Sequence, residues 1–130
     1  MKEFVISEVK AETAVLVGLI TQEQDEAKTK EYLDELEFLA DTAGAVTVKR
    51  FTQKVQGPSQ VTYVGKGKLE EIKQYIKECE DAYEEWLDAG SPLPLEGQGE
   101  TPQPVGMVIF DDELSAKQIR NIIEDRQSVV

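Results

Sequence analysis

Residues 13–20 read Thr-Ala-Val-Leu-Val-Gly-Leu-Ile, a nearly continuous apolar run. A β-strand that is buried on both faces, as in a parallel sheet, has this pattern. Residues 27–43 follow with apolar side chains at helical spacing, and residues 45–52 then read as a second strand that becomes polar at its end. This strand–helix–strand unit predicts an α/β fold with a mainly parallel sheet.

The helix predicted over residues 27–43 carries a stripe of apolar side chains at spacings of three and four, which we expect to face the sheet. That stripe, with two neighbours beside it, consists of Tyr32, Leu36, Leu39, Ala43, Leu33 and Ala40. Gly44 directly follows the helix, and glycine is a common C-terminal stop signal.

The second half of the chain continues the alternation. Residues 67–88 have strong helical periodicity, residues 105–110 read as another buried strand, and residues 116–125 read as a helix. Residues 127–130 look like the start of a further strand, so we expect a fragment cut at a domain edge. The sequence therefore predicts one small three-layer domain over residues 1–130, with a sheet of about four strands flanked by helices.

Two connections contain turn-forming residues. Residues 53–60 are predicted as a loop interrupted by a Gly-Pro pair, and residues 61–64 as either a short edge strand or an extended loop. Residues 89–104 hold four of the five prolines and are predicted as a flexible or partly extended connection.

The composition limits the classes of protein to consider. The chain has no histidine and one cysteine, Cys79, so a zinc or haem site is not expected. We expect Cys79 to be a small buried side chain, and Tyr83 and Trp86 on the same helical stripe to pack in the core or at the helix end. No apolar run approaches the roughly 20 residues that cross a bilayer, and the N-terminus lacks a signal-peptide pattern, which predicts a cytoplasmic protein without a membrane span.

The charge of the chain is unevenly distributed. The net charge is −12, but residues 45–77 carry seven basic and two acidic side chains. Residues 78–104 carry eight acidic side chains and no basic one. A positive segment inside an acidic chain indicates either a binding face or lysines that are simply solvated.

Residues 61–71 read Val-Thr-Tyr-Val-Gly-Lys-Gly-Lys-Leu-Glu-Glu and open the second predicted helix. Glycine permits close approach of the backbone, and lysines at a helix N-terminus are unfavourable for the helix dipole. A contact to phosphate or to an RNA backbone is one interpretation, and a glycine turn that lets the chain enter the helix is the other. The stretch is not a nucleotide P-loop, because Leu69 stands where Ser or Thr is required.

Asp111, Asp112 and Glu113 follow the third predicted strand. Carboxylates at the end of a strand are potential Mg²⁺ ligands. The alternative is that these acids stabilise the N-terminus of the next helix, with Asp112 or Ser115 as its cap. In that case Gln118 is the capping-box partner of Ser115.

Three segments together resemble the N-terminal domain of the HflX family of ribosome-associated GTPases. They are the apolar run from Ala14, the Val-Thr-Tyr-Val-Gly-Lys-Gly-Lys-Leu-Glu-Glu stretch, and Val-Ile-Phe-Asp-Asp-Glu-Leu-Ser from Val108, which is followed by Gln118, Arg120 and Asn121. The similarity extends over nearly the whole chain.

The resemblance implies an α/β domain that precedes a helical hairpin and a GTPase domain, where GTP and Mg²⁺ would bind. It implies that the full-length protein binds the large ribosomal subunit and splits stalled or idle ribosomes under stress. In the family, the N-terminal domain contacts ribosomal RNA and influences GTP hydrolysis by its neighbour. This chain contains no Gly-x-x-x-x-Gly-Lys-Ser/Thr sequence, so we expect no enzymatic activity from it alone.

The resulting hypothesis is a docking and regulatory domain. Its candidate contacts to ribosomal RNA or to the adjoining GTPase domain are Lys54, Tyr63, Gly65, Lys66, Gly67, Lys68, Gln118, Arg120 and Asn121. The alternative is a nucleotide-binding domain, with phosphate at Gly65–Lys68 and Mg²⁺ at Asp111 and Asp112. The Pro/Gly-rich segment over residues 89–104 is longer than is usual in the family, and with the acidic stretch before it places negative charge near a domain expected to meet RNA.

Overall fold

The computed structural model describes residues 12–93 and 101–128, with the side chains of the last helix described as far as Ile123. The described residues alternate between strand and helix, as predicted. The elements are β1 (Glu12–Ile20), α1 (Glu26–Thr42), β2 (Ala45–Lys54), α2 (Lys66–Asp88), β3 (Met107–Phe110) and α3 (Ala116–Ser128).

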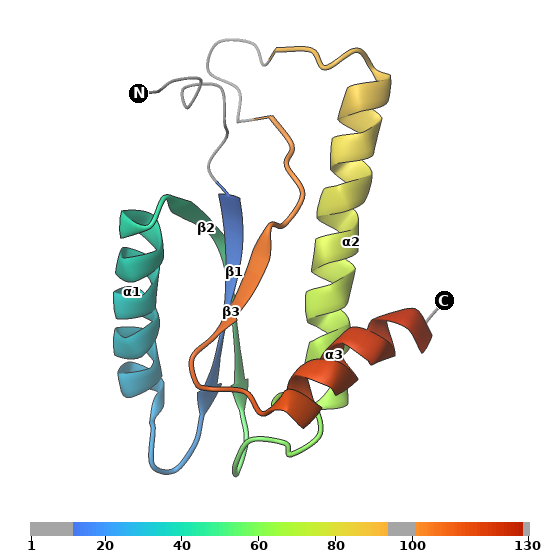
Figure 1. Ribbon diagram of the computed structural model, residues 1–130. Helices are drawn as coiled ribbons and strands as arrows, with labels where there is room; N and C mark the ends of the chain where they lie inside the picture. Colours follow the sequence, from blue (N-terminus) through green and yellow to red (C-terminus); the bar gives the residue numbers. More distant parts are fainter. Residues whose placement is uncertain (1–11, 94–100, 129–130) are drawn as a thin grey trace.

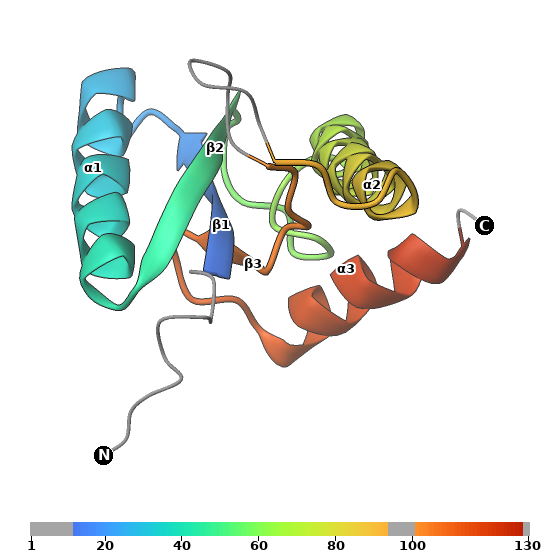
Figure 2. The same ribbon diagram turned by 90° about the horizontal axis from the view of Figure 1, so that it is seen from above.

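The elements form three layers with the sheet in the middle (Figures 1 and 2). Helix α1 covers one face of the sheet, and α2 and α3 cover the other. The strand order is β2-β1-β3, and β1 pairs in parallel with both neighbours. The predicted α/β fold with a parallel sheet is confirmed.

Strand β1 is central, and its side chains alternate between the two helical layers. Val15, Val17 and Leu19 belong to the main core cluster, which includes Leu69 and Ile72 of α2. The intervening residues of β1 face α1. Because both faces of the strand are covered, seven consecutive residues from Thr13 are buried, and this explains the apolar run in the sequence.

Helix α1 packs closely on β1 because Gly18 has no side chain. A Cβ atom at Gly18 would lie 3.2 Å from Cγ2 of Thr29 and 3.3 Å from both terminal methyl groups of Leu33. Thr29 is itself buried, and its hydroxyl donates a 2.9 Å hydrogen bond to the carbonyl oxygen of Leu19. A polar residue thus occupies a core position on this helix.

The buried face of α1 differs from the predicted stripe. Leu33 and Ala40 are buried together with Thr29, whereas the side chains of Tyr32 and Leu39 are 38% and 54% exposed. The prediction was wrong for Tyr32 and Leu39, and also for Ala43, which is exposed, because it counted only apolar residues. The buried face of α1 includes Thr29, because the hydroxyl group of Thr29 finds a hydrogen-bond acceptor in the backbone of β1.

The sheet of the described residues has three strands, whereas about four were predicted. The fourth was expected over residues 127–130. Helix α3 continues through Gln127 and Ser128, because no glycine or proline interrupts it after Asp125. Residues 129–130 lie outside the described residues.

The segment over residues 61–64 is a turn rather than an edge strand. Its only β-type pairing in the described structure is an antiparallel bridge between Tyr63 and Ser59, which lies just before the segment. Strand β2 also runs on to Lys54, so the connection begins later than predicted. Of the connection predicted over residues 89–104, residues 94–100 lie outside the described residues.

Two aromatic side chains pack against each other near the C-terminal end of α2. The rings of Tyr83 and Trp86 have centroids 6.0 Å apart, and Nε1 of Trp86 donates a 2.8 Å hydrogen bond to the carbonyl oxygen of Pro92. Both rings therefore pack at the helix end. Cys79 is half-buried, not fully buried as expected. No helix in the described ranges is both long and apolar enough to cross a membrane.

Candidate nucleic-acid interface at the start of helix α2

The candidate residues gather at one edge of the sheet. The three parallel strands point the same way, so their carboxyl ends meet at this edge, which is the lower one in Figure 1. The turn before α2, the first turn of α2 and the start of α3 all lie there. In open α/β sheets, ligands are bound outside the carboxyl ends of the strands.

The turn over residues 59–64, called the Tyr63 turn from here on, has an unusual backbone. Ser59 and Tyr63 exchange two backbone hydrogen bonds of 2.9 Å, and Tyr63 has φ of 69°. A left-handed conformation is uncommon for a bulky residue. The Tyr63 side chain is 5% exposed, and its ring meets that of Phe110 edge-on at 5.5 Å. Packing against β3 therefore holds the strained residue in place.

The hydroxyl group of Tyr63 lies in a negative environment. Burial, with the nearby carboxylates of Asp112 and Asp111, raises the pKa of Tyr63 to about 12. The phenol is therefore neutral at physiological pH. Tyr63 thus places the Tyr63 turn close to the acidic segment after β3, Asp111 and Asp112.

Gly65 is the N-cap residue of α2, and a glycine fits there because the backbone lies very close to a side chain of β2. Its N–H donates a 2.8 Å hydrogen bond to Oε1 of Gln53, and a Cβ atom would lie 2.8 Å from Nε2 of the same side chain. Its φ of −67° is accessible to any residue, so conformational freedom is not what requires glycine. Gln53 thus joins the end of β2 to the start of α2.

The first turn of α2 is open. Lys66 and Gly67 are exposed, and a Cβ atom at Gly67 would have no neighbour within 4 Å. No side chain caps the helix and no acidic residue lies in its first turn. The first N–H groups of a helix lack intrahelical acceptors, so they point outward here.

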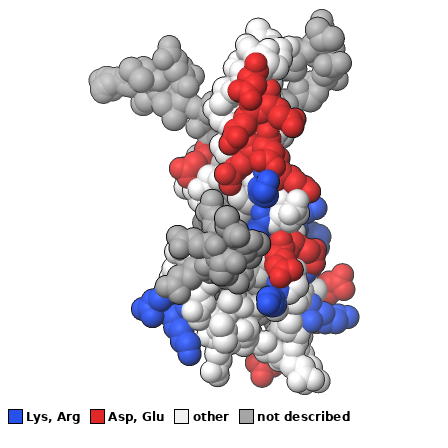
Figure 3. Space-filling view, turned by 90° about the vertical axis from the view of Figure 1, so that its right-hand side faces the viewer, with Lys and Arg blue, Asp and Glu red and all other residues white. Residues whose placement is uncertain are grey.

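The lysines at this turn differ in their partners. Nζ of Lys68 lies 3.2 Å from a carboxylate oxygen of Glu71, and the Lys68 side chain is largely buried. Lys66 is exposed, and so is Lys54, the residue directly after Gln53. Figure 3, which views the molecule from the right-hand side of Figure 1, shows a dense acidic stripe over the upper part of α2 and both basic and acidic side chains over the lower part.

The structure places Gln118 and Asn121 against the Tyr63 turn. Nε2 of Gln118 donates a 2.6 Å hydrogen bond to the carbonyl oxygen of Ser59, and Nδ2 of Asn121 donates one of 3.1 Å to that of Val61. Both amides are therefore engaged within the domain. Arg120 is exposed. At 100° per residue, it lies on a different face of α3 from these two amides.

Ser115 is the N-cap of α3, as one of the two interpretations predicted. Its hydroxyl oxygen accepts a 3.0 Å hydrogen bond from the N–H of Gln118, and Oε1 of Gln118 accepts one of 2.8 Å from the N–H of Ser115. These two bonds form a capping box. The same Gln118 side chain therefore caps α3 and contacts the Tyr63 turn.

The carboxylates of Asp111 and Asp112, in the acidic segment after β3, accept hydrogen bonds from groups within the domain. Oδ2 of Asp111 accepts a 3.1 Å hydrogen bond from Nε2 of Gln24, and Oδ1 of Asp112 accepts one of 2.7 Å from the N–H of Glu113. Burial, with the charge of Asp112, raises the pKa of Asp111. Among the described residues, no group of three Asp, Glu, His or Cys side chains is placed to hold a metal ion. Mg²⁺ at Asp111 and Asp112 thus finds no support in the geometry.

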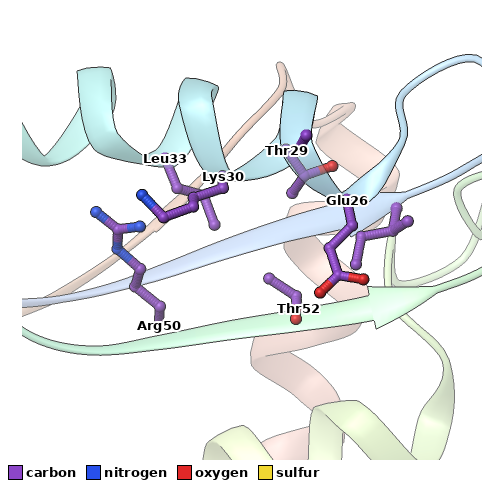
Figure 4. Close-up of a pocket in the computed structure, with 8 residues that line it drawn as sticks. Glu26, Thr29, Lys30, Leu33, Arg50 and Thr52 are labelled. Carbon is purple, nitrogen blue, oxygen red and sulfur yellow. The ribbon is translucent and has the colours of Figure 1, made fainter.

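Sequence reasoning missed a cavity of about 520 Å³ between α1 and the ends of β1 and β2. Figure 4 shows the nitrogen atoms of Lys30 and Arg50 at one end and the Glu26 carboxylate directed toward Thr52 at the other. Lys30 and Arg50 both lie 2.8 Å from carboxylate oxygens of Asp34.

The cations of this cavity are neutralised within the domain. Arg50 also pairs with Glu37 at 2.9 Å, and hydrogen bonds from Lys30 and Arg50 lower the pKa of Asp34. The cavity is therefore a weak anion site compared with the start of α2. Only the i, i+4 spacing of Lys30 and Asp34 could be read from the sequence.

The region that a known protein family shares with this chain includes the Tyr63 turn and the start of α2. A family model described as "GTP-binding GTPase N-terminal" matches residues 30–83, which include most of α1, β2, the Tyr63 turn and most of α2. The chain is 40% identical over 114 residues to a protein named GTPase HflX from Flavobacterium psychrophilum, covering 88% of this chain and 22% of that protein.

Two further relatives carry the same name. The protein from Caldanaerobacter subterraneus subsp. tengcongensis is 35% identical over 85% of this chain and 19% of its own length. The protein from Lacrimispora saccharolytica is 38% identical over 85% of this chain and 20% of its own length. The chain thus spans about a fifth of the length of these curated relatives.

Proposed function

This chain belongs to the family of HflX N-terminal domains, and we propose that it docks a GTP-binding protein onto ribosomal RNA of the large ribosomal subunit. The docking site is the start of α2, with Lys66, Gly67 and Lys68 at its centre. The whole protein is a GTPase with GTP and Mg²⁺ in another domain, and the present domain regulates that activity and takes part in ribosome splitting under stress.

The open first turn of α2 supports this proposal most directly. A helix N-terminus carries partial positive charge and outward N–H groups, and both attract phosphate. Lysines at this position repel the helix dipole, so they weaken the helix unless an anion is bound. Gly67 also lowers helix stability relative to alanine, although neither packing nor a positive φ requires a glycine there. Glycine at this position leaves room for a phosphate group to reach the backbone.

The charge distribution supports one orientation of docking. The acidic stripe over the upper part of α2 lies on the same face as a lower part that carries both basic and acidic side chains (Figure 3). RNA phosphate is repelled by the stripe and attracted by the Lys and Arg side chains of the lower part. The proposed complex therefore places the start of α2 against RNA and the C-terminal end of α2 away from it.

A nucleotide-binding domain is the weaker alternative. Phosphate at Gly65–Lys68 is common to both proposals. Its second component, Mg²⁺ at Asp111 and Asp112, lacks a suitable cluster in the described residues. Calorimetry of the chain with ATP and with GTP tests this alternative, and the absence of any heat of binding at millimolar nucleotide would contradict it.

Co-sedimentation with separated ribosomal subunits tests the proposed function. The 130-residue chain is mixed at low salt with purified large or small subunits and pelleted through a sucrose cushion. We expect it to pellet with the large subunit and to lose this association when Lys66 and Lys68 are both changed to Ala.

The matched control is Lys28→Ala with Lys30→Ala, which removes the same charge from α1, on the opposite face of the sheet. This control variant should pellet like the unaltered chain. Equal loss in both double variants would show that net charge, not the start of α2, is responsible. Failure of the unaltered chain to pellet with either subunit would overturn the proposal.

A further inference from the structure

Two side chains of α3 contact the Tyr63 turn, although α3 lies more than fifty residues further along the chain. Gln118 donates to the carbonyl oxygen of Ser59 at 2.6 Å, and Asn121 donates to that of Val61 at 3.1 Å. The Ser59 oxygen also accepts the N–H of Tyr63 at 2.9 Å. Gln118 therefore binds the same atom that closes the bridge around the left-handed residue.

The Tyr63 turn depends on contacts from outside itself. The turn contains neither a helix nor a paired strand, and its bridge is isolated. Tyr63 has φ of 69°, a conformation that packing must hold. Gln53 supports the last residue of the connection through the N–H of Gly65, and Phe110 supports the ring of Tyr63. The two amides of α3 complete the set of supports.

Among the side chains described, as far as Ile123, few attach helix α3 to the rest of the domain. Ile122, and Leu114 just before the helix, pack against the main core cluster. Ile119 and Ile123 are 45% and 56% exposed on the outer side. The two amide hydrogen bonds to the Tyr63 turn are thus a large part of the contacts described for α3, and a displacement of α3 would be transmitted to the turn.

We propose that Gln118 and Asn121 are positioning residues that let α3 control how the start of α2 is presented to phosphate. This inference rests on the proposed function and adds its regulation. With α3 seated, the Tyr63 turn is fixed and the N–H groups of Lys66 and Gly67 are preorganised for an anion. When α3 is displaced, the turn loosens and the same groups bind more weakly, because binding must then order them.

Gln118→Glu separates this role from simple helix stability. Glutamate is a standard capping-box residue, so the cap of α3 is kept. An ionised carboxylate has no N–H, so the hydrogen bond to Ser59 is lost. Ser115→Ala is the matched control, because it removes the cap and keeps the Nε2 donor of Gln118. Asn121→Leu removes the second contact without changing charge.

Amide hydrogen exchange of the 130-residue chain is the primary measurement. We expect Gln118→Glu and Asn121→Leu to speed exchange at Tyr63 and Gly65 by roughly fivefold, the factor that follows from the loss of one hydrogen bond. Exchange in β1 should stay unchanged. Ser115→Ala should leave Tyr63 and Gly65 unchanged. Equal exchange at these two amides in all four proteins would overturn the inference.

Binding to large ribosomal subunits is measured on the same proteins. The inference predicts weaker binding for Asn121→Leu, with an unaltered dependence on salt, because the number of phosphate contacts is the same. If the unaltered chain binds and Asn121→Leu binds equally well, the positioning role is wrong while the proposed function stands. If the unaltered chain does not bind but exchange changes as expected, the proposed function fails and α3 only supports the turn.

Discussion

The backbone N–H of Gly65 donates a 2.8 Å hydrogen bond to Oε1 of Gln53, so the end of β2 fixes the start of α2. A side chain on residue 65 would displace the amide of Gln53, because a Cβ atom would lie 2.8 Å from its nitrogen. This single contact explains the first glycine of the Gly-Lys-Gly-Lys stretch. The second glycine has no such partner.

Gly65→Ala should destabilise the domain. The flexible Gln53 side chain can move away, so the loss is that of the hydrogen bond, about 1 kcal/mol. Chemical denaturation measures the free energy of unfolding. In a Gln53→Ala background the same change should have a smaller effect, since the contact is already absent. An equal effect in both backgrounds would show that the two residues are not coupled.

Gly67→Ala should have the opposite effect on stability and should weaken binding. Nothing lies within 4 Å of the added Cβ atom, and alanine is favoured over glycine in a helix by roughly 0.5–1 kcal/mol. The melting temperature should therefore rise while affinity for large ribosomal subunits falls. A variant that is more stable and binds equally well would show that the open space at Gly67 is not used.

Asp111→Asn should stabilise the domain at neutral pH. Burial and the charge of Asp112 raise the pKa of Asp111 above its ordinary value of 3.8, although the hydrogen bond from Gln24 acts in the other direction. The folded state therefore favours the protonated acid. The stabilisation that protonated Asp111 gives the folded state is fully present below pH 3.8, and it is lost as the pH rises through the folded-state pKa of Asp111.

Thermal melts of the two proteins across pH test this prediction. Asparagine keeps an acceptor for Gln24 but carries no charge. The variant should melt higher than the unaltered chain at about pH 7, and the two should converge near pH 3. Glu113→Gln controls for removal of a surface charge. A difference that persists unchanged at low pH would rule out titration of Asp111 as its cause.

Gly18→Ala should destabilise the contact between β1 and α1. The added methyl group would lie 3.2–3.3 Å from side-chain carbons of Thr29 and Leu33. Overpacking of this kind costs about 1–3 kcal/mol. Gly57→Ala is the matched control, because a Cβ atom there has no neighbour within 4 Å. Equal unfolding free energies for both variants would contradict the close packing of α1 on β1.

The fold could be predicted because its signal is local. The apolar run of β1 is long enough to indicate burial on both faces, and Gly44 marks the end of α1. The boundaries of α3 were less certain, since no breaking residue follows Asp125. The packed face of α1 was predicted incorrectly because the core position of Thr29 depends on a backbone acceptor in β1, which hydropathy does not reveal.

The candidate site could be predicted only in part. Gly65–Lys68 stood out because two glycines and two lysines at a helix start are unfavourable for the helix alone. The contacts of Gln118 and Asn121 with the Tyr63 turn join residues about sixty positions apart, and no local pattern encodes them. The neutralisation of Arg50 by two acids of α1 is likewise a product of the fold.

The salt dependence of binding to large ribosomal subunits tests the central claim most directly. The logarithm of affinity for RNA falls linearly with the logarithm of salt concentration, and loss of one phosphate contact reduces the slope by about 1. Changing both Lys66 and Lys68 to Ala should therefore reduce the slope by about 2, whereas Lys28→Ala with Lys30→Ala should leave it unchanged. An unchanged slope in the Lys66 and Lys68 variant would show that the start of α2 does not contact phosphate.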